Sequence, residues 1–185
     1  MLSKALVSRS MRTTYIDPAL SPVEEHQFAL TFWSQKRGSA FAPRWGSFDL
    51  LEFPPSVIPR INVVDFDADT DGQIYRFWGT ALTAIHGGDF TGFSPVDVPT
   101  KRFGESAQIG YARLVMERVP NLEVKEFTGP DNVVGRELIL RLPLTDDGEI
   151  VSHGLAVCYY EISDPYSPLH DFFNKILQPI MSDED

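Results

Sequence analysis

The chain has 185 residues, of which 43% are hydrophobic and 12% aromatic. This is enough for one domain with a buried core, and too rich in aromatic rings for a disordered chain. The formal net charge is −10 without a local basic patch, so we expect no binding to nucleic acid or anionic lipid. A single cysteine, Cys158, excludes an internal disulfide, and no apolar run reaches the roughly 18 residues of a membrane span. These features predict a cytoplasmic protein.

The first part of the chain predicts a leader and one helix. Residues 1–20 lack hydrophobic periodicity, so we predict that they form a flexible leader. The sequence Ser21-Pro22-Val23-Glu24 is a capping box with proline at the first helical position. It predicts a helix over 22–36, ended by Gly38. Residues 38–60 are rich in proline and glycine, which leaves room for no more than a short helical turn.

The middle of the chain predicts a hairpin followed by helices. Residues 60–68 and 73–79 are rich in β-branched and aromatic residues and flank the sequence Asp-Thr-Asp-Gly, a strong turn signal. A short helix over 80–85 follows, ended by a Gly-Gly pair. A longer helix is predicted over 105–119, where apolar residues recur at helical spacing before Pro120.

Three further strands are predicted at 122–127, 135–144 and 149–162, and a last helix at 168–177 precedes an acidic end. Two strands, a helical crossing and three strands predict an α+β fold. We expect a five-stranded antiparallel sheet with the middle helices on one face, and the N-terminal helix free to cover part of the other. One domain is predicted over 21–165, followed by a C-terminal helix and tail over 166–185.

Three short motifs occur in order along this pattern. They are YRFWGT at 75–80, DFTG at 89–92, and LPL at 142–144 followed by Asp147-Gly148. Each resembles a motif of the PAS family, in its branch of small stand-alone bacterial proteins, and the resemblance spans residues 40–162. It implies the PAS fold and a role in sensing or protein interaction, and it implies no particular chemistry.

A PAS-like sheet and its helices would enclose a small, mostly apolar pocket. A small molecule bound there would signal through a partner, such as a signalling kinase, or through a homodimer. The helix over 22–36 and the exposed sheet face are the expected contact surfaces. The residues expected to line the pocket are Phe77, Trp78, Ile85, His86, Tyr111, Leu114, Val115, Arg136, Leu138 and Leu140. Strand alternation cannot place Phe77 and Trp78 on the same side, so one of the two must point elsewhere.

No sequence motif identifies a catalytic or metal site. Gly87-Gly88-Asp89-Phe90 resembles part of the diguanylate cyclase signature, but it lacks the further acidic residue and is interpreted as a helix stop and turn. The four histidines form no metal-ligand spacing. Haem-binding PAS domains usually carry their histidine on the longer helix, and the helix over 105–119 has none. We therefore assign no cofactor, and interpret Cys158 as a small core residue.

Arg136 has two interpretations. It shares a strand face with Leu138, Leu140 and Leu142. If that face is the core, its guanidinium either anchors an acidic ligand or forms a structural salt bridge, and we favour the salt bridge, with Glu105, Glu117 or Asp89 as partner.

Two alternative functions remain compatible with the sequence. A small enzyme on a cone-like α+β fold would need a buried pair of catalytic groups, for which His86 and Asp89 are the near neighbours. A structural adaptor with a filled core would bind no small molecule.

Overall fold

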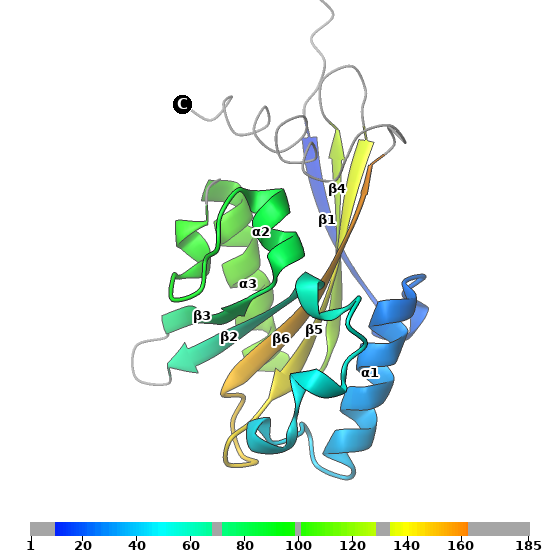
Figure 1. Cartoon of the computed structure of the whole chain (residues 1–185), viewed down its shortest axis with the longest axis vertical. Helices are drawn as coiled ribbons and strands as arrows, with labels where there is room; N and C mark the ends of the chain where they lie inside the picture. The colour runs from blue at the N-terminus through cyan, green and yellow to red at the C-terminus, as the bar shows by residue number, and fades with distance from the viewer. Residues whose placement is uncertain (1–9, 68–71, 99–100, 129–133, 163–185) are drawn as a thin grey trace, which may run out of the picture.

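The computed structural model describes residues 10–67, 72–98, 101–128 and 134–162 (Figure 1). Within them lie six strands: β1 (Ser10–Ile16), β2 (Ile61–Asp67), β3 (Gly72–Trp78), β4 (Asn121–Thr128), β5 (Val134–Leu144) and β6 (His153–Ile162). The α-helices are α1 (Glu24–Arg37), α2 (Thr80–His86) and α3 (Lys101–Glu117). Short 3-10 helices are η1 (Pro18–Leu20), η2 (Trp45–Ser47), η3 (Leu50–Glu52), η4 (Ile58–Arg60) and η5 (Pro95–Asp97). Among these residues, no helix combines the length and apolar character that a membrane-spanning helix requires.

The six strands form one antiparallel sheet in the order β1-β4-β5-β6-β2-β3. The predicted α+β class with a single antiparallel sheet is confirmed. The predicted number of five strands is wrong, because β1 adds a sixth at the edge beside β4. The five predicted strands are contiguous, and β6 returns to lie beside β2, with Leu155 opposite Val63.

Strand β1 corrects the predicted leader. Residues 10–16 pair with β4 along their whole length, from Ser10 opposite Thr128 to Ile16 opposite Leu122. Residues 11–16 are all half-buried or exposed, so this strand lacks the clear alternation that one buried face would impose. Its partner also lies far away in sequence, since Thr14 and Val124 are 110 positions apart. Residues 1–9 lie outside the described part of the chain.

Most other predicted elements are found with shifted ends. Helix α3 begins at residue 101 rather than 105, and β6 begins at 153 rather than 149. The later start of β6 has a local cause: the Asp147 carboxylate accepts hydrogen bonds from the backbone N–H groups of Glu149 (2.7 Å) and Ile150 (3.0 Å). These bonds hold the backbone in a turn that cannot pair as a strand. The helix predicted over 168–177 and the acidic tail lie outside the described residues.

The two faces of the sheet are covered by different helices. Helices α2 and α3 lie on one face, as predicted, and α1 with the 3-10 turns lies on the other (Figure 1). Strand β5 shows the division by its alternation. Leu138, Leu140, Leu142 and Leu144 face α1, whereas the residues between them face α2 and α3.

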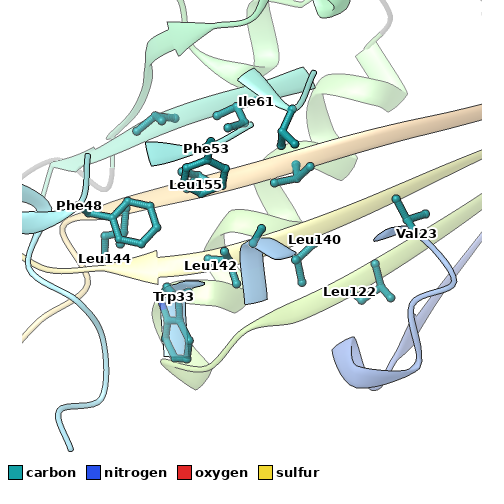
Figure 2. Close-up of a cluster of buried hydrophobic side chains, with 14 of the residues drawn as sticks. Val23, Trp33, Phe48, Phe53, Ile61, Leu122, Leu140, Leu142, Leu144 and Leu155 are labelled. Carbon is teal, nitrogen blue, oxygen red and sulfur yellow. The ribbon is translucent and has the colours of Figure 1, made fainter. Parts of the chain in front are cut away.

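The α1 side is an apolar core. Figure 2 shows Leu142 of β5 near Trp33 of α1, Leu144 of β5 near Phe48, and Phe53 near Leu155 of β6. Phe53 meets the rings of Phe28 and Phe32 edge-on, at centroid distances of 5.5 and 5.1 Å. The proline-rich segment 38–60 is therefore held against the sheet by its aromatic side chains, without any long element of its own.

Helix α1 is fixed to the sheet by two buried hydrogen bonds. Trp33 Nε1 donates to Pro143 O at 2.7 Å, and His26 Nε2 lies 3.0 Å from Val157 O. A carbonyl can only accept, so His26 donates from Nε2 and its Nδ1 accepts from the Ser21 hydroxyl at 2.8 Å. The ring is therefore neutral, and burial lowers its pKa to about 4.

The Ser21 hydroxyl donates to His26 and accepts from the backbone N–H of Val23 at 3.3 Å, so it does not form the predicted capping box with Glu24. The helix begins at Glu24 after Val23, which makes no side-chain cap. Gly38 ends the helix, with a φ of +55°.

His26 predicts a pH dependence of stability. In the unfolded chain the ring has its ordinary pKa near 6.5, whereas in the fold it stays neutral down to about pH 4. Below pH 6.5 the unfolded state binds an extra proton, so the free energy of unfolding falls by about 1.4 kcal/mol per pH unit from this group. This pH dependence can be measured by urea unfolding of the wild type and the His26→Gln variant between pH 7.5 and 4.5.

The variant should be less stable at neutral pH, with a shallower loss on acidification. Parallel pH profiles of the two proteins would show that His26 is not held neutral.

Candidate functional site

The face of the sheet under α2 and α3 carries a buried layer of charged side chains. Glu123 and Lys125 project from β4, and Glu137 and Arg141 from β5, and each of the four is at most 1% exposed. The register explains how they meet, because Lys125 lies opposite Glu137 and Glu123 lies opposite Ile139, two residues from Arg141. Charged residues are rarely buried unless they are paired, so this layer is the first candidate for a functional site.

Arg141 and Glu123 form the closest ion pair of the layer. Arg141 Nη1 donates to Glu123 Oε2 at 2.6 Å, and the Ser106 hydroxyl of α3 donates to the other carboxylate oxygen at 3.1 Å. The Lys125 ammonium lies 3.4 Å from Glu137 and 3.9 Å from Glu123. It also sits over the ring of Phe103, 4.4 Å from the centroid, which is a cation–π contact.

The charges of the layer stabilise one another. Burial alone would raise the pKa of Glu123, but the Arg141 guanidinium and the Lys125 ammonium outweigh it and hold this pKa below its usual value. Burial alone would likewise lower the pKa of Arg141, and Glu123 reverses that effect. Two buried carboxylates thus balance two buried cations, and the layer carries no net charge.

A chain of neutral hydrogen bonds continues from the charged layer. The Tyr111 hydroxyl of α3 donates to Asn62 Oδ1, and Asn62 Nδ2 points to Cys158 Sγ at 3.6 Å. Burial raises the pKa of the Cys158 thiol to about 12. Cys158 is therefore a protonated, buried core residue, as predicted, and has no thiolate character at neutral pH.

His86, at the end of α2, lies in an aromatic wall beside the charged layer. Its ring is 5.4 Å from Trp78 and 4.7 Å from Phe103, and Nε2 is 3.0 Å from the Tyr160 hydroxyl. Burial, helped by the positive charge of Lys125, lowers the His86 pKa to about 3. The imidazole is therefore neutral over the physiological pH range.

These groups surround a very small cavity of about 10 Å³, lined by residues of β2, β3, α2, α3, β5 and β6. Three buried nitrogens of its lining residues, Trp78 Nε1, His86 Nδ1 and Arg141 Nε, have no hydrogen-bond partner among the described residues, and neither do the two carboxylate oxygens of Glu137. The space is of the order of one water molecule. Most of its lining side chains are apolar or aromatic, and Asn62, His86, Glu137 and Arg141 add polar groups.

The predicted pocket residues lie in several different parts of the fold. Trp78, His86 and Tyr111 line the cavity, and Ile85 and Leu114 belong to the surrounding core cluster. Phe77, Leu138 and Leu140 lie on the α1 face of the sheet, so Phe77 is the misplaced member of its pair with Trp78. Val115 is 38% exposed on α3 and does not line the cavity.

Arg136 lies at the margin of the sheet rather than in a pocket. Its side chain is 40% exposed and contacts Glu161 at 3.3 Å and Glu126 at 3.9 Å. The favoured interpretation as a salt bridge is confirmed. The proposed partners were wrong, because the carboxylates that Arg136 contacts belong to its cross-strand neighbours in β4 and β6.

Sequence reasoning missed the four charged residues of the interior. We assigned the cavity to the face of β5 that carries the leucines, and this face meets α1 instead. A usable signal was present: Glu137, Ile139 and Arg141 alternate with the leucines and mark a second face, and a sheet covered by helices on both sides buries both.

The pair proposed for an enzyme is not brought together. His86 is buried against Tyr160, whereas Asp89 is exposed and its carboxylate accepts from the backbone N–H (2.9 Å) and hydroxyl (2.7 Å) of Thr91. Within the described ranges, no group of three or more histidine, cysteine, aspartate or glutamate side chains has a geometry suited to a metal ion.

Comparisons with known proteins give no family for this chain. No protein-family model, no curated protein and no solved structure matches it. The interior site and the order of the elements are thus the observations on which a function is proposed.

Gly110 of α3 tests how rigidly Arg141 is held. A methyl group at this position would lie 2.5 Å from Arg141 Cζ and Nη1, and the ion pair with Glu123 prevents the guanidinium from moving away. Gly110→Ala should therefore destabilise the protein by about 1 to 2 kcal/mol despite the helix propensity gained. Gly46→Ala is the control, since it has nothing within 4 Å and should change stability by less than about 0.5 kcal/mol.

Denaturant unfolding gives both values. A Gly110→Ala variant at least as stable as wild type would show that Arg141 is free to move.

Glu123→Gln tests the charge balance of the interior. The substitution keeps the shape of the side chain but leaves Arg141 and Lys125 with one buried carboxylate between them. We expect a loss of about 3 kcal/mol or more in the free energy of unfolding. Glu126→Gln, at a half-exposed position of the same strand, should cost less than about 0.5 kcal/mol. Equal effects of the two would contradict a tightly balanced interior.

Proposed function

We propose that this chain is a sensory or docking module of the PAS kind, whose interior site receives a small, polar, uncharged molecule. The observation that carries the proposal is the set of buried polar atoms on cavity-lining residues, among them Trp78 Nε1 and His86 Nδ1, that have no hydrogen-bond partner among the described residues. Buried polar groups in proteins are nearly always hydrogen-bonded. A bound molecule would supply an acceptor for the indole N–H.

The order of the elements supports the PAS comparison. Two strands, a helical crossing by α2 and α3, and three further strands follow one another along the chain, as the motif resemblance implies. In space, β6 lies next to β2. The cavity is enclosed between this sheet and the crossing helices, which is where a PAS-like module would hold its ligand.

The electrostatics favour an uncharged molecule. The two carboxylates and two cations of the interior already balance, and His86 is neutral. A charged ligand would enter without a counter-charge and would lose its hydration, which costs several kcal/mol for a buried ion. A neutral group with both a donor and an acceptor, such as an amide or hydroxyl, fits the lining.

Because the interior cavity is so small, we propose that a ligand binds there only when a helix moves. A space of about 10 Å³ admits more than a water molecule only if α2 or α3 shifts outward. Phe103 and Tyr111 of α3 and His86 of α2 form part of the wall. A ligand that favours the shifted state would change the outer surface of these helices, and so the docking of a partner protein or a second copy.

The closed interior also favours a second candidate function, a structural adaptor without a ligand. In that case the cavity holds water, and the charged layer serves to fix α3 on the sheet. This candidate predicts that no small molecule stabilises the protein.

Two experiments test the proposal. Native mass spectrometry and the absorbance spectrum of the purified protein detect a co-purified molecule, and thermal-shift measurements compare the melting temperature with different added probes. Acetamide should raise the melting temperature more than its charged counterparts, acetate and methylammonium, at equal ionic strength. Trp78→Phe should abolish that difference and any co-purified mass, because it removes the indole donor. Trp45→Phe, outside the cavity, is the matched control.

A protein with no bound mass and equal responses to all three probes would favour the adaptor. The same shift in wild type and Trp78→Phe would contradict the proposed site.

A further inference from the structure

Helix α3 carries apolar residues on two faces. Phe103, Ala107, Tyr111 and Leu114 point into the core. On the outer side, Ile109 and Met116 are 63% and 83% exposed, and exposed Ala112 lies between them at helical spacing. A helix that packs one face on a core normally presents charged residues on the other, so this outer row needs an explanation.

The outer row borders a groove of about 680 Å³. One wall consists of Phe66, Asp67, Gly72 and Gln73, where β2 ends and β3 begins, and another of Glu149, Ile150 and Val151 before β6. The volume lies within the range of sites that hold ligands. The groove does not include the interior cavity, although α3 borders both.

We infer that this groove docks an amphipathic helix of a partner protein, with an apolar row and basic flanks. Residues 109, 112 and 116 are three and four positions apart, which is the spacing at which one helix packs its side chains against another. A partner helix would place its own anchors between Ile109 and Met116 and against Phe66 and Ile150. This is recognition of a helix in a groove, and an exposed apolar row at such a groove marks an interaction site.

The charge around the groove selects the partner. Asp67 and Glu149 line it, and the chain as a whole has a net charge of −10. Arg118, the basic residue of the lining, is engaged within the fold: it donates to Glu149 O at 2.7 Å and lies over the ring of Phe41. Lysine or arginine beside the apolar row of the partner would complement the exposed Glu149 carboxylate and the negative net charge of the chain.

A second copy of this chain fits less well than a basic helix. It would bring the same carboxylates to the same place, and like charges brought together at an interface oppose association. The inference does not depend on the proposed ligand site, because the groove exists with the interior closed.

The test uses a fluorescein-labelled leucine–lysine helical peptide of about 18 residues, or five turns. A leucine–glutamate peptide with the same apolar row and a glycine–lysine peptide with the same charge are the comparison probes. Fluorescence anisotropy should show binding of the leucine–lysine peptide about tenfold or more tighter than either. Ile109→Ser with Met116→Ser should weaken it by about tenfold or more. Leu51→Ser is the matched control, because Leu51 is 84% exposed elsewhere, and it should leave the affinity unchanged.

The chain contains four methionines, so the methyl NMR signal of Met116 can be assigned by its loss in Met116→Ser. It should move on addition of the leucine–lysine peptide, whereas Leu51→Ser should leave both that shift and the affinity intact. Equal binding of the glycine–lysine peptide, or unchanged affinity of the Ile109/Met116 variant, would overturn the inference. The inference would also be overturned if sedimentation showed that the wild-type protein is a dimer and that the Ile109/Met116 variant is a monomer. The occupant of the groove would then be a second copy of the chain.

Discussion

The buried ion pair between Arg141 and Glu123 is the constraint around which the α3 side of the molecule is arranged. Its 2.6 Å contact joins β5 to β4, and the guanidinium lies against Tyr111 of α3, 5.0 Å from the ring centroid. Gly110 leaves the space that the guanidinium occupies. Helix and sheet are thus fitted through an ion pair that would lose much of its energy if α3 moved away and water entered.

This constraint gives the two faces of the sheet different physical characters. On the α1 face, leucines and aromatic rings pack together, and their stabilisation depends on buried area rather than on direction. On the α3 face, ion pairs and hydrogen bonds depend on distance and angle. The apolar face tolerates exchange between similar side chains better. The polar face specifies one position for α3, at the expense of buried groups such as Trp78 Nε1 that the described protein does not satisfy.

The sequence alone was sufficient to predict the helices and strands whose signals lie within a few neighbouring residues. The β2–β3 hairpin, α2 and β5 are confirmed, because turn residues and alternation act over a few positions. Strand β1 was missed because its hydrogen-bond partners in β4 lie far along the chain. The site was predicted only in part: Trp78, His86 and Tyr111 line the cavity, but alternation alone could not say which face of β5 meets α3. That choice depends on the ion pairs, which form only when β4 and β5 are in register.

Helix α3 connects the interior to the surface. Gly110 and Tyr111 contact the charged layer, while Ile109 and Ala112, one residue to either side, border the outer groove. A helix with hydrogen-bonded turns moves as a unit, so a displacement that widens the cavity also changes the groove. The two proposals are then coupled thermodynamically, although each can be true alone. A molecule in the interior changes affinity in the groove only by its preference for the displaced state, and a helix in the groove must change affinity in the interior by the same factor.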